Sequence, residues 1–102
     1  MKIRFKIDKT KEFQQWFDTQ TEKERMQIDG RLSNIECYGH FGVYKDLEDD
    51  ISELKWLNGR RVYYSYIQEL NILLLLGGNK NGQDKDITKA KKIFKKYINI
   101  NA

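Results

Sequence analysis

The segment from residue 60 to residue 90, RRVYYSYIQELNILLLLGGNKNGQDKDITKA, constrains the fold of this 102-residue chain more than any other. Residues 60–66 alternate in polarity, which is typical of a strand with two different faces. Residues 69–76 end in a continuous apolar run, which predicts a central strand with a neighbour on each side. The glycine-rich residues 77–85 predict a loop. The segment therefore predicts two strands, a loop and, as the next pattern shows, the start of a helix.

A lysine-rich helix is predicted over residues 86–98, with Asp84 or Asp86 as its cap. Its apolar stripe at helical spacing consists of Ile87, Ala90, Phe94 and Tyr97.

The first half of the chain predicts a strand and two helices. Residues 2–7 alternate basic and apolar side chains, so Ile3, Phe5 and Ile7 would share one face of a half-buried strand. Residues 10–18 carry aromatic residues at helical spacing. Thr21 followed by Glu24 is a capping-box pattern, which opens a second helix that ends at Tyr38-Gly39.

Two further strands are predicted over residues 43–48 and 51–57. Asn58-Gly59 separates the second of them from the strand 60–66, and both residues tolerate the positive φ of a type I′ hairpin turn. This spacing indicates an antiparallel meander. A chain of this length supports one sheet with helices on one face. The expected fold class is therefore α+β, in one domain of residues 1–102.

Composition limits the classes of function. The chain has 19 Lys and Arg against 15 Asp and Glu, a formal net charge of +4, which favours association with polyanions. Cys37 is the only cysteine, so no internal disulfide can form and we expect a cytoplasmic protein. One His and one Cys do not supply a structural zinc site. The apolar run 72–76 is too short to span a bilayer, and the N-terminus does not read as a signal peptide. We expect no metal, no cofactor and no membrane association.

Strand alternation predicts which side chains would be available for chemistry. The residues expected to face the helices are Leu54, Trp56, Val62, Tyr64 and Tyr66. The residues expected on the open face are Glu53, Lys55, Arg61, Tyr63 and Ser65. Lys80, just past the strand 69–76, would reach the same surface.

This predicted open-face cluster suits a phosphodiester substrate. The fork of Arg61 matches phosphate oxygens, and Tyr63 could stack on a base. Glu53 or Lys55 could remove a proton. RNA carries its own nucleophile, the 2′-hydroxyl, so cleavage without a metal needs a base, an acid and cations around the phosphate.

A plainer interpretation fits the same residues. Charges on the exposed face of a sheet are usually solvated, and Glu, Lys and Arg on paired strands form ordinary cross-strand ion pairs. The lysines of residues 85–96 are likewise most often a solvated helix face, although they could bind phosphates. GGNKNG lacks the spacing of a phosphate-binding P-loop.

The chain also contains four short sequence motifs: GHFG at 39–42, SEL at 52–54, RVYY at 61–64 and LLLLGGNKNGQDKDITKAKK at 73–92. Through them the chain resembles the addiction-module killer proteins, HigB-like members of the RelE/ParE toxin superfamily of bacterial type II toxin–antitoxin systems. The resemblance runs from Phe13 to Ala90. The residues that fit the family pattern GGdKxxQxxDIxxA are Gly77, Gly78, Lys80, Gln83, Asp86, Ile87 and Ala90.

The resemblance implies a curved, mainly antiparallel sheet of about five strands, with two N-terminal helices and one C-terminal helix. It places the helices on one side and the reactive surface on the other. The implied activity is ribosome-dependent mRNA cleavage that arrests translation. The implied partners are the ribosome, mRNA and an antitoxin with a helix-turn-helix, through which the complex would reach operator DNA.

Site residues follow from the residue pattern together with this resemblance. The expected catalytic residues are Arg61, Lys80, Glu53 and Lys55. The expected RNA-binding residues are Tyr63, Arg60, Lys85, Lys89, Lys92 and Lys96. Lys55 stands where the family commonly has Arg, and Arg60 takes an aromatic position. Some members of the superfamily act on DNA gyrase, so a ParE-like gyrase inhibitor or a co-repressor is the alternative function.

Overall fold

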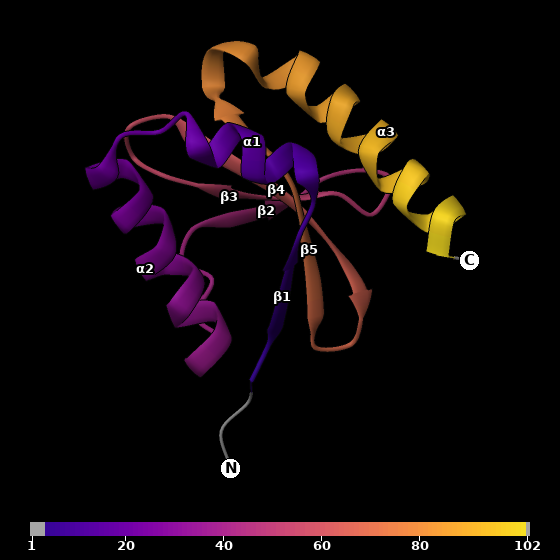
Figure 1. Ribbon diagram of the computed structural model, residues 1–102, viewed down its shortest axis with the longest axis horizontal. Helices are drawn as coiled ribbons and strands as arrows, with labels where there is room; N and C mark the ends of the chain where they lie inside the picture. The colour runs from indigo at the N-terminus through magenta and orange to yellow at the C-terminus, as the bar shows by residue number, and fades with distance from the viewer. Residues whose placement is uncertain (1–3, 102) are drawn as a thin grey trace.

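The computed structural model describes residues 4–101 of the chain (Figure 1). Its elements, in chain order, are β1 (Lys6–Lys9), α1 (Lys11–Asp18), α2 (Glu22–Tyr38), β2 (Tyr44–Asp46), β3 (Ser52–Lys55), β4 (Arg60–Gln68), β5 (Asn71–Asn79), the 3-10 turn η1 (Lys80–Gly82) and α3 (Gln83–Asn101). This is the α+β architecture expected from the sequence, and residues 2 and 3 of the expected first strand lie outside the described range.

The strands form one sheet in the order β1-β5-β4-β3-β2. β2, β3, β4 and β5 pair antiparallel in sequence order, which confirms the predicted meander. β1 joins the free side of β5 in parallel, with Lys6 opposite Asn71. β5 is therefore central, as its apolar run predicted.

Local capping explains where the first two helices begin. The Thr10 side chain accepts a hydrogen bond from the Phe13 backbone and caps α1. The capping box predicted at Thr21 and Glu24 forms in both directions at the start of α2. Gly39, with φ of 68°, ends α2 in the left-handed region that favours glycine.

The C-terminal boundaries differ from the prediction. β5 continues to Asn79 and α3 begins at Gln83, so residues 77–85 are not a loop. Asp84 and Asp86 lie inside the first turn of α3, and the Asn79 side chain caps η1 instead. Gly77 and Gly78 lie in β5 at positions where side chains of α1 and α3 pack directly against the backbone. A Cβ at Gly77 would overlap the Trp16 ring, and one at Gly78 would overlap the Asp86 carboxylate.

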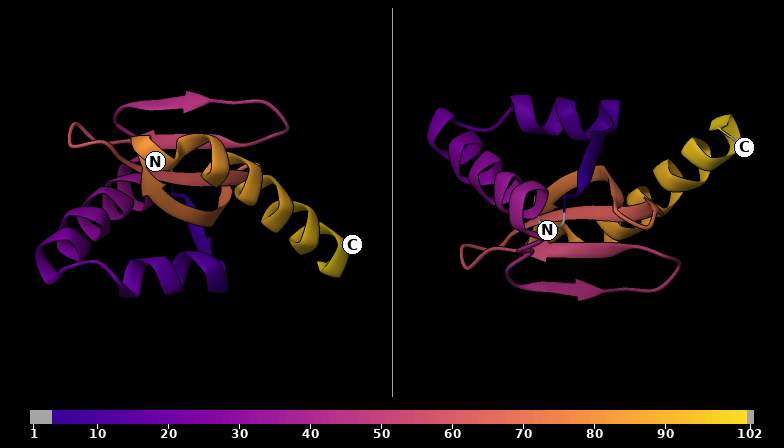
Figure 2. Two further views of the ribbon diagram at one scale, coloured as in Figure 1. Left: turned by 90° about the horizontal axis from the view of Figure 1, so that it is seen from above. Right: turned by 90° about the horizontal axis from the view of Figure 1, so that it is seen from below.

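Hydrophobic cores lie on both faces of the sheet. One packs β-strand side chains such as Leu54, Val62 and Tyr64 against α1 and α2. The other packs Tyr63, Leu73 and Leu75, together with their neighbours, against Ala90, Ile93 and Phe94 of α3. Figure 2 shows α1 and α2 grouped away from α3 around the curved sheet. The expected open face is therefore wrong, because α3 covers it. The inward assignment of Leu54, Trp56, Val62 and Tyr64 is confirmed, whereas Tyr66 is 46% exposed.

Candidate functional site at one end of the sheet

Three strand ends and the start of α3 meet at one end of the sheet. Lys55, the last residue of β3, pairs with Arg61 near the start of β4, and Arg61 pairs with Gly78 near the end of β5. The Lys80 backbone then donates to Gly59 O at 2.9 Å, which joins η1 to the β3–β4 turn. The fold thus brings three of the four expected catalytic residues, Lys55, Arg61 and Lys80, to the same end.

Glu53, the fourth, is buried beside Arg61. Its side chain is 1% exposed and that of Arg61 is 10% exposed, and Glu53 Oε2 lies 3.9 Å from Arg61 Nε. Arg61 Nη1 donates to Arg60 O at 3.1 Å, and its Nε has no hydrogen-bond partner among the described residues. The two residues therefore form an ion pair without a direct hydrogen bond.

Gln83 completes this arrangement, and no chemical role was predicted for it. As the first residue of α3, it extends its amide Nε2 to Glu53 Oε1 at 3.2 Å and to Oε2 at 3.0 Å. The only signal in the sequence was its place in the 73–92 motif. Only the packing of α3 on this face reveals that the amide reaches a strand residue 30 positions away.

Tyr63 lies close enough to Glu53 and Asp86 to be affected by both charges. Tyr63 is fully buried, and its pKa is raised first by burial and then by the charges of Glu53 and Asp86. Burial also raises the pKa of Asp86, while Lys89 opposes that change. Tyr63 keeps its hydroxyl proton at neutral pH. A ring buried under α3 does not stack on a nucleic-acid base, so that expectation is corrected.

Lys80 and Lys55 border the buried pair at the surface. Lys80 is exposed, and its aliphatic carbons pack over Gly59, where a Cβ would lie 3.5 Å from Lys80 Cγ. Gly59 has φ of 94°, so the turn and the close approach both favour glycine. Lys55 is half-buried. The sheet end therefore presents positive charge outside and a carboxylate inside.

Arg60 lies apart from this site, on the α2 side of the sheet. It is 5% exposed, with Nη2 3.6 Å from Glu24 Oε2 and its guanidinium 5.5 Å from the centre of the Trp56 ring. Both of its Nη atoms donate to Gln27 Oε1 at 3.3 Å. The expected RNA contact from Arg60 is not supported by this position, where the side chain ties β4 to α2.

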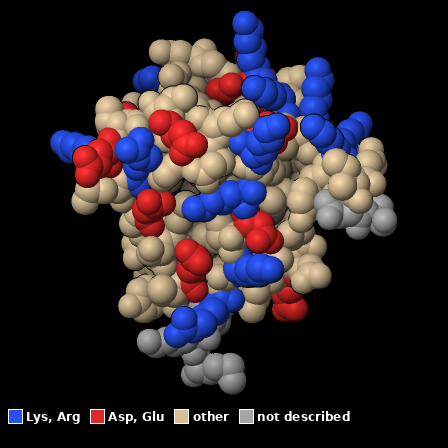
Figure 3. Space-filling model, in the orientation of Figure 1, with Lys and Arg blue, Asp and Glu red and all other residues tan. Residues whose placement is uncertain are grey.

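The expected RNA-binding lysines form one stripe along α3. All are exposed, and in Figure 3 blue side chains project from the upper right of the molecule, where α3 lies. The members of this stripe, hereafter the α3 lysine stripe, are Lys85, Lys89, Lys92 and Lys96. Neighbouring Lys91 instead pairs with Asp49 at 3.2 Å.

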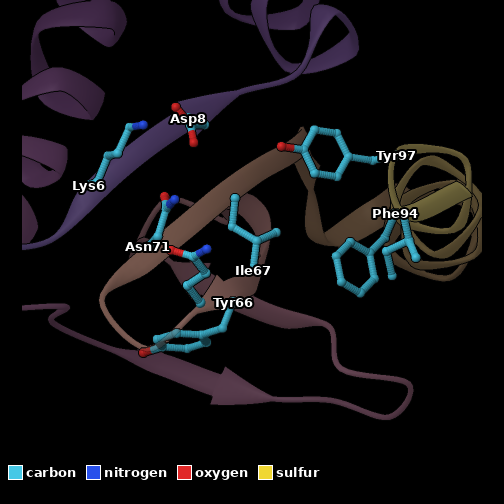
Figure 4. Close-up of a pocket in the computed structure, with 9 residues that line it drawn as sticks. Lys6, Asp8, Tyr66, Ile67, Asn71, Phe94 and Tyr97 are labelled. Carbon is cyan, nitrogen blue, oxygen red and sulfur yellow. The ribbon is translucent and has the colours of Figure 1, made fainter. Parts of the chain in front are cut away.

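A separate groove lies at the opposite end of β4 and β5 (Figure 4). It has a volume of about 550 Å³ and lies between β1, the β4–β5 turn and the C-terminal half of α3. Its wall combines Lys6, Asp8 and Asn71 with Tyr66, Phe94 and Tyr97. None of the expected site residues lines this groove.

Within residues 4–101, no cluster of three or more His, Cys, Asp or Glu side chains has a geometry that could hold a metal ion. Over the same residues, no helix has the length and apolar character needed to cross a bilayer.

Comparisons with known proteins found similarity in sequence and in structure. No family model matches the sequence. An uncharacterized protein of Haemophilus influenzae is 37% identical over 71 residues, which are 68% of this chain and 71% of that protein. The isolated E. coli RelE toxin matches with a TM-score of 0.58 at 12% identity, over 83% of this chain and 97% of the toxin. A conserved hypothetical protein from Helicobacter pylori has a TM-score of 0.48 at 16% identity, over 76% and 96% of the two chains.

These matches carry different information. The RelE match, at low sequence identity, shows a common fold. The Haemophilus influenzae protein is similar in sequence over most of both chains. The chain belongs to the same protein family as this Haemophilus influenzae protein, and its fold is that of the RelE toxin.

Proposed function

We propose that the protein is the toxin of a type II toxin–antitoxin system, a HigB-like, ribosome-dependent mRNA endoribonuclease that arrests translation in the bacterial cytoplasm. The observation that carries the proposal is the meeting of Lys55, Arg61 and Lys80 at one end of a RelE-like sheet. A phosphodiester is the substrate that such a group of cations suits best.

The proposed chemistry needs only the RNA, these side chains and water. The 2′-oxygen attacks the phosphorus, the bond to the 5′-oxygen breaks, and a 2′,3′-cyclic phosphate is left. Arg61 and Lys80 stabilise the charge that develops on the phosphate oxygens. Glu53, or Lys55 in its neutral amine form, takes the 2′-hydroxyl proton, and of the two only Lys55 is more than marginally exposed. The leaving 5′-oxygen takes a proton from a solvent water, and the protonated base then returns its proton to solvent.

Further interactions would direct the enzyme to its target. The α3 lysine stripe would lie along the phosphate backbone of ribosomal RNA, because exposed lysines at helical spacing follow a line of phosphates. A basic chain of net charge +4 would be neutralised by an acidic or amphipathic antitoxin with a helix-turn-helix. That complex would in turn bind operator DNA.

The test is inducible expression of wild type, Arg61→Ala and Lys80→Ala, with transcript 5′ ends mapped at matched protein levels. We expect new 5′ ends with wild type and a loss of about 10²-fold in each variant, because each removes a stabiliser of developing charge. Lys23→Ala, an exposed lysine of α2, is the charge-matched control and should cut like wild type. Equal cutting by all four proteins would reject the site, and growth arrest with intact transcripts would reject the activity.

A ParE-like gyrase inhibitor, or a co-repressor without enzyme activity, is the second candidate. It is favoured by the burial of Glu53 and Tyr63, which leaves mainly cations at the surface of the sheet end. A DNA-supercoiling assay with purified gyrase separates the two functions. Loss of supercoiling without transcript cleavage would select the gyrase inhibitor.

A further inference from the structure

The carboxylate of Glu53 has two competing partners at the sheet end. Arg61 is the stronger one in principle, because a guanidinium and a carboxylate form paired, charge-assisted hydrogen bonds. The Arg61 Nε to Glu53 Oε2 distance is nevertheless 3.9 Å, which is too long for a hydrogen bond. The neutral Gln83 amide instead donates hydrogen bonds to both carboxylate oxygens, at 3.0 and 3.2 Å.

Arg61 consequently retains donor capacity in a buried place. Its Nε is a buried atom without a hydrogen-bond partner among the described residues, although the side chain is 10% exposed. A buried donor left unpaired costs free energy, so an arrangement that maintains one calls for an explanation. The exposed 10% of the Arg61 side chain could meet a phosphate oxygen at the sheet end, where Lys55 and Lys80 also lie.

We propose that Gln83 is a positioning residue, which occupies the Glu53 carboxylate and thereby keeps the Arg61 guanidinium free to bind an RNA phosphate. The identity of the ligand rests on the proposed function, whereas the competition between Gln83 and Arg61 for Glu53 does not. Removing the amide lets Glu53 turn to Arg61 and close a paired salt bridge. Arg61 is then withdrawn from the phosphate.

The experiment follows the Arg61 side chain directly. The ¹⁵Nε–¹Hε NMR signal of Arg61, assigned with Arg61→Lys, reports its hydrogen bonding, and inorganic phosphate is the probe of binding. In Gln83→Leu the ¹Hε resonance should move downfield, as expected for a carboxylate partner. Phosphate affinity should fall about tenfold, since the guanidinium no longer donates a charge-assisted hydrogen bond to the phosphate. Gln15→Leu, an exposed amide of α1, is the control and should change neither quantity.

The double variant Glu53→Gln/Gln83→Leu separates positioning from simple support of the fold. It removes the competing carboxylate, so the Arg61 signal and the phosphate affinity should return toward wild type. A merely structural Gln83 would give a double variant no better than Gln83→Leu, and that result would overturn the proposal. An unchanged Arg61 signal in Gln83→Leu would overturn it as well.

A second route remains if Gln83→Leu does not fold. Glu53→Gln alone removes the competitor and should bind phosphate at least as tightly as wild type, so a loss of binding would contradict the proposal. Transcript cleavage by the same variants tests a different statement. If Arg61 responds as described while wild type leaves transcripts intact, the proposed function fails and the role of Gln83 stands.

Discussion

Two glycines near the end of β5, Gly77 and Gly78, decide how closely α1 and α3 approach the sheet. The Trp16 ring occupies the space that a side chain at residue 77 would need, and the Asp86 carboxylate does the same at residue 78. A ring is a rigid obstacle, whereas a carboxylate is the end of a flexible side chain. Gly77 is therefore the less replaceable of the two.

Gly77→Ala should destabilise the protein by about 1–3 kcal/mol, the usual cost of forcing an extra methyl group into a filled core. Gly30→Ala is the matched control, because nothing lies within 4 Å of a Cβ at this helical position. It should instead stabilise the protein by about 1 kcal/mol through helix propensity. Urea unfolding of the two variants measures both values, and equal midpoints would contradict the assigned packing of Trp16 on Gly77.

Another residue, Arg31, shows how one side chain can hold an irregular region. It donates from Nε to Phe41 O at 2.9 Å and from its two Nη atoms to Lys55 O and Val43 O, both at 2.5 Å. Its guanidinium also lies 4.3 Å from the centre of the Trp56 ring. Burial lowers the pKa of Arg31 below its usual range. The segment after α2, which has little regular structure, is thereby tied to the end of β3.

At the scale of the element, α3 serves two purposes at once. Its buried side, Ala90, Ile93 and Phe94, covers the sheet face that carries Glu53 and Arg61. Its exposed side carries the α3 lysine stripe. The same helix therefore shields the buried carboxylate and offers a positively charged surface around it.

Replacing two members of the stripe, Lys89→Gln/Lys92→Gln, should weaken binding to purified ribosomes and make it less dependent on salt. The slope of log affinity against log salt should become shallower by roughly 0.7–0.9 for each phosphate that a lysine no longer neutralises. Lys23→Gln/Lys45→Gln removes the same charge from exposed positions on α2 and β2 and controls for net charge alone. Identical slopes for the two double variants would reject a specific role for the stripe.

At the scale of the whole molecule, the sequence predicted the elements better than their layering. Side-chain period and turn residues located the strands, the α2 capping box and the central place of β5. They did not show that α3 crosses to the second face, and this error left Glu53 and Tyr63 exposed in the prediction. One signal was present: the run 72–76 is apolar on both sides, and such a strand needs a cover on each face.

The candidate site was predictable only as a set of residues. Lys55, Arg61 and Lys80 follow from pairing around the Asn58-Gly59 turn, because register fixes which residues are neighbours. Gln83 and the burial of Glu53 depend on how a helix docks, which no local pattern encodes. Arg60 and Arg61 are adjacent in sequence and lie on opposite faces of the sheet. The alternation of side chains along the strand, and not the residue type, therefore determines the surroundings of each arginine.

The parallel pairing of β1 with β5 sets an order of events in folding. β4 and β5 are joined by a two-residue turn and can zip together quickly, whereas Thr10 Oγ1 bonds Leu75 O from 65 positions away. Bringing β1 next to β5 closes a long loop, and the entropy of the chain falls before the strand pair can form its hydrogen bonds. In pulsed hydrogen-exchange labelling during refolding, the amides of β4 and β5 should be protected before those of Lys6 and Thr10, which bond Leu70 O and Leu74 O. Simultaneous protection of both sets would contradict this order.

During synthesis the consequence is a delay. β1 is made well before β5, so it has to wait, unpaired, until the residues of its partner strand have been added and have left the ribosome. The α1 segment that follows it packs on the same late strand, against Gly77. β1 and α1 are therefore made early and find their place late, and an unfinished copy of the protein lacks a complete sheet.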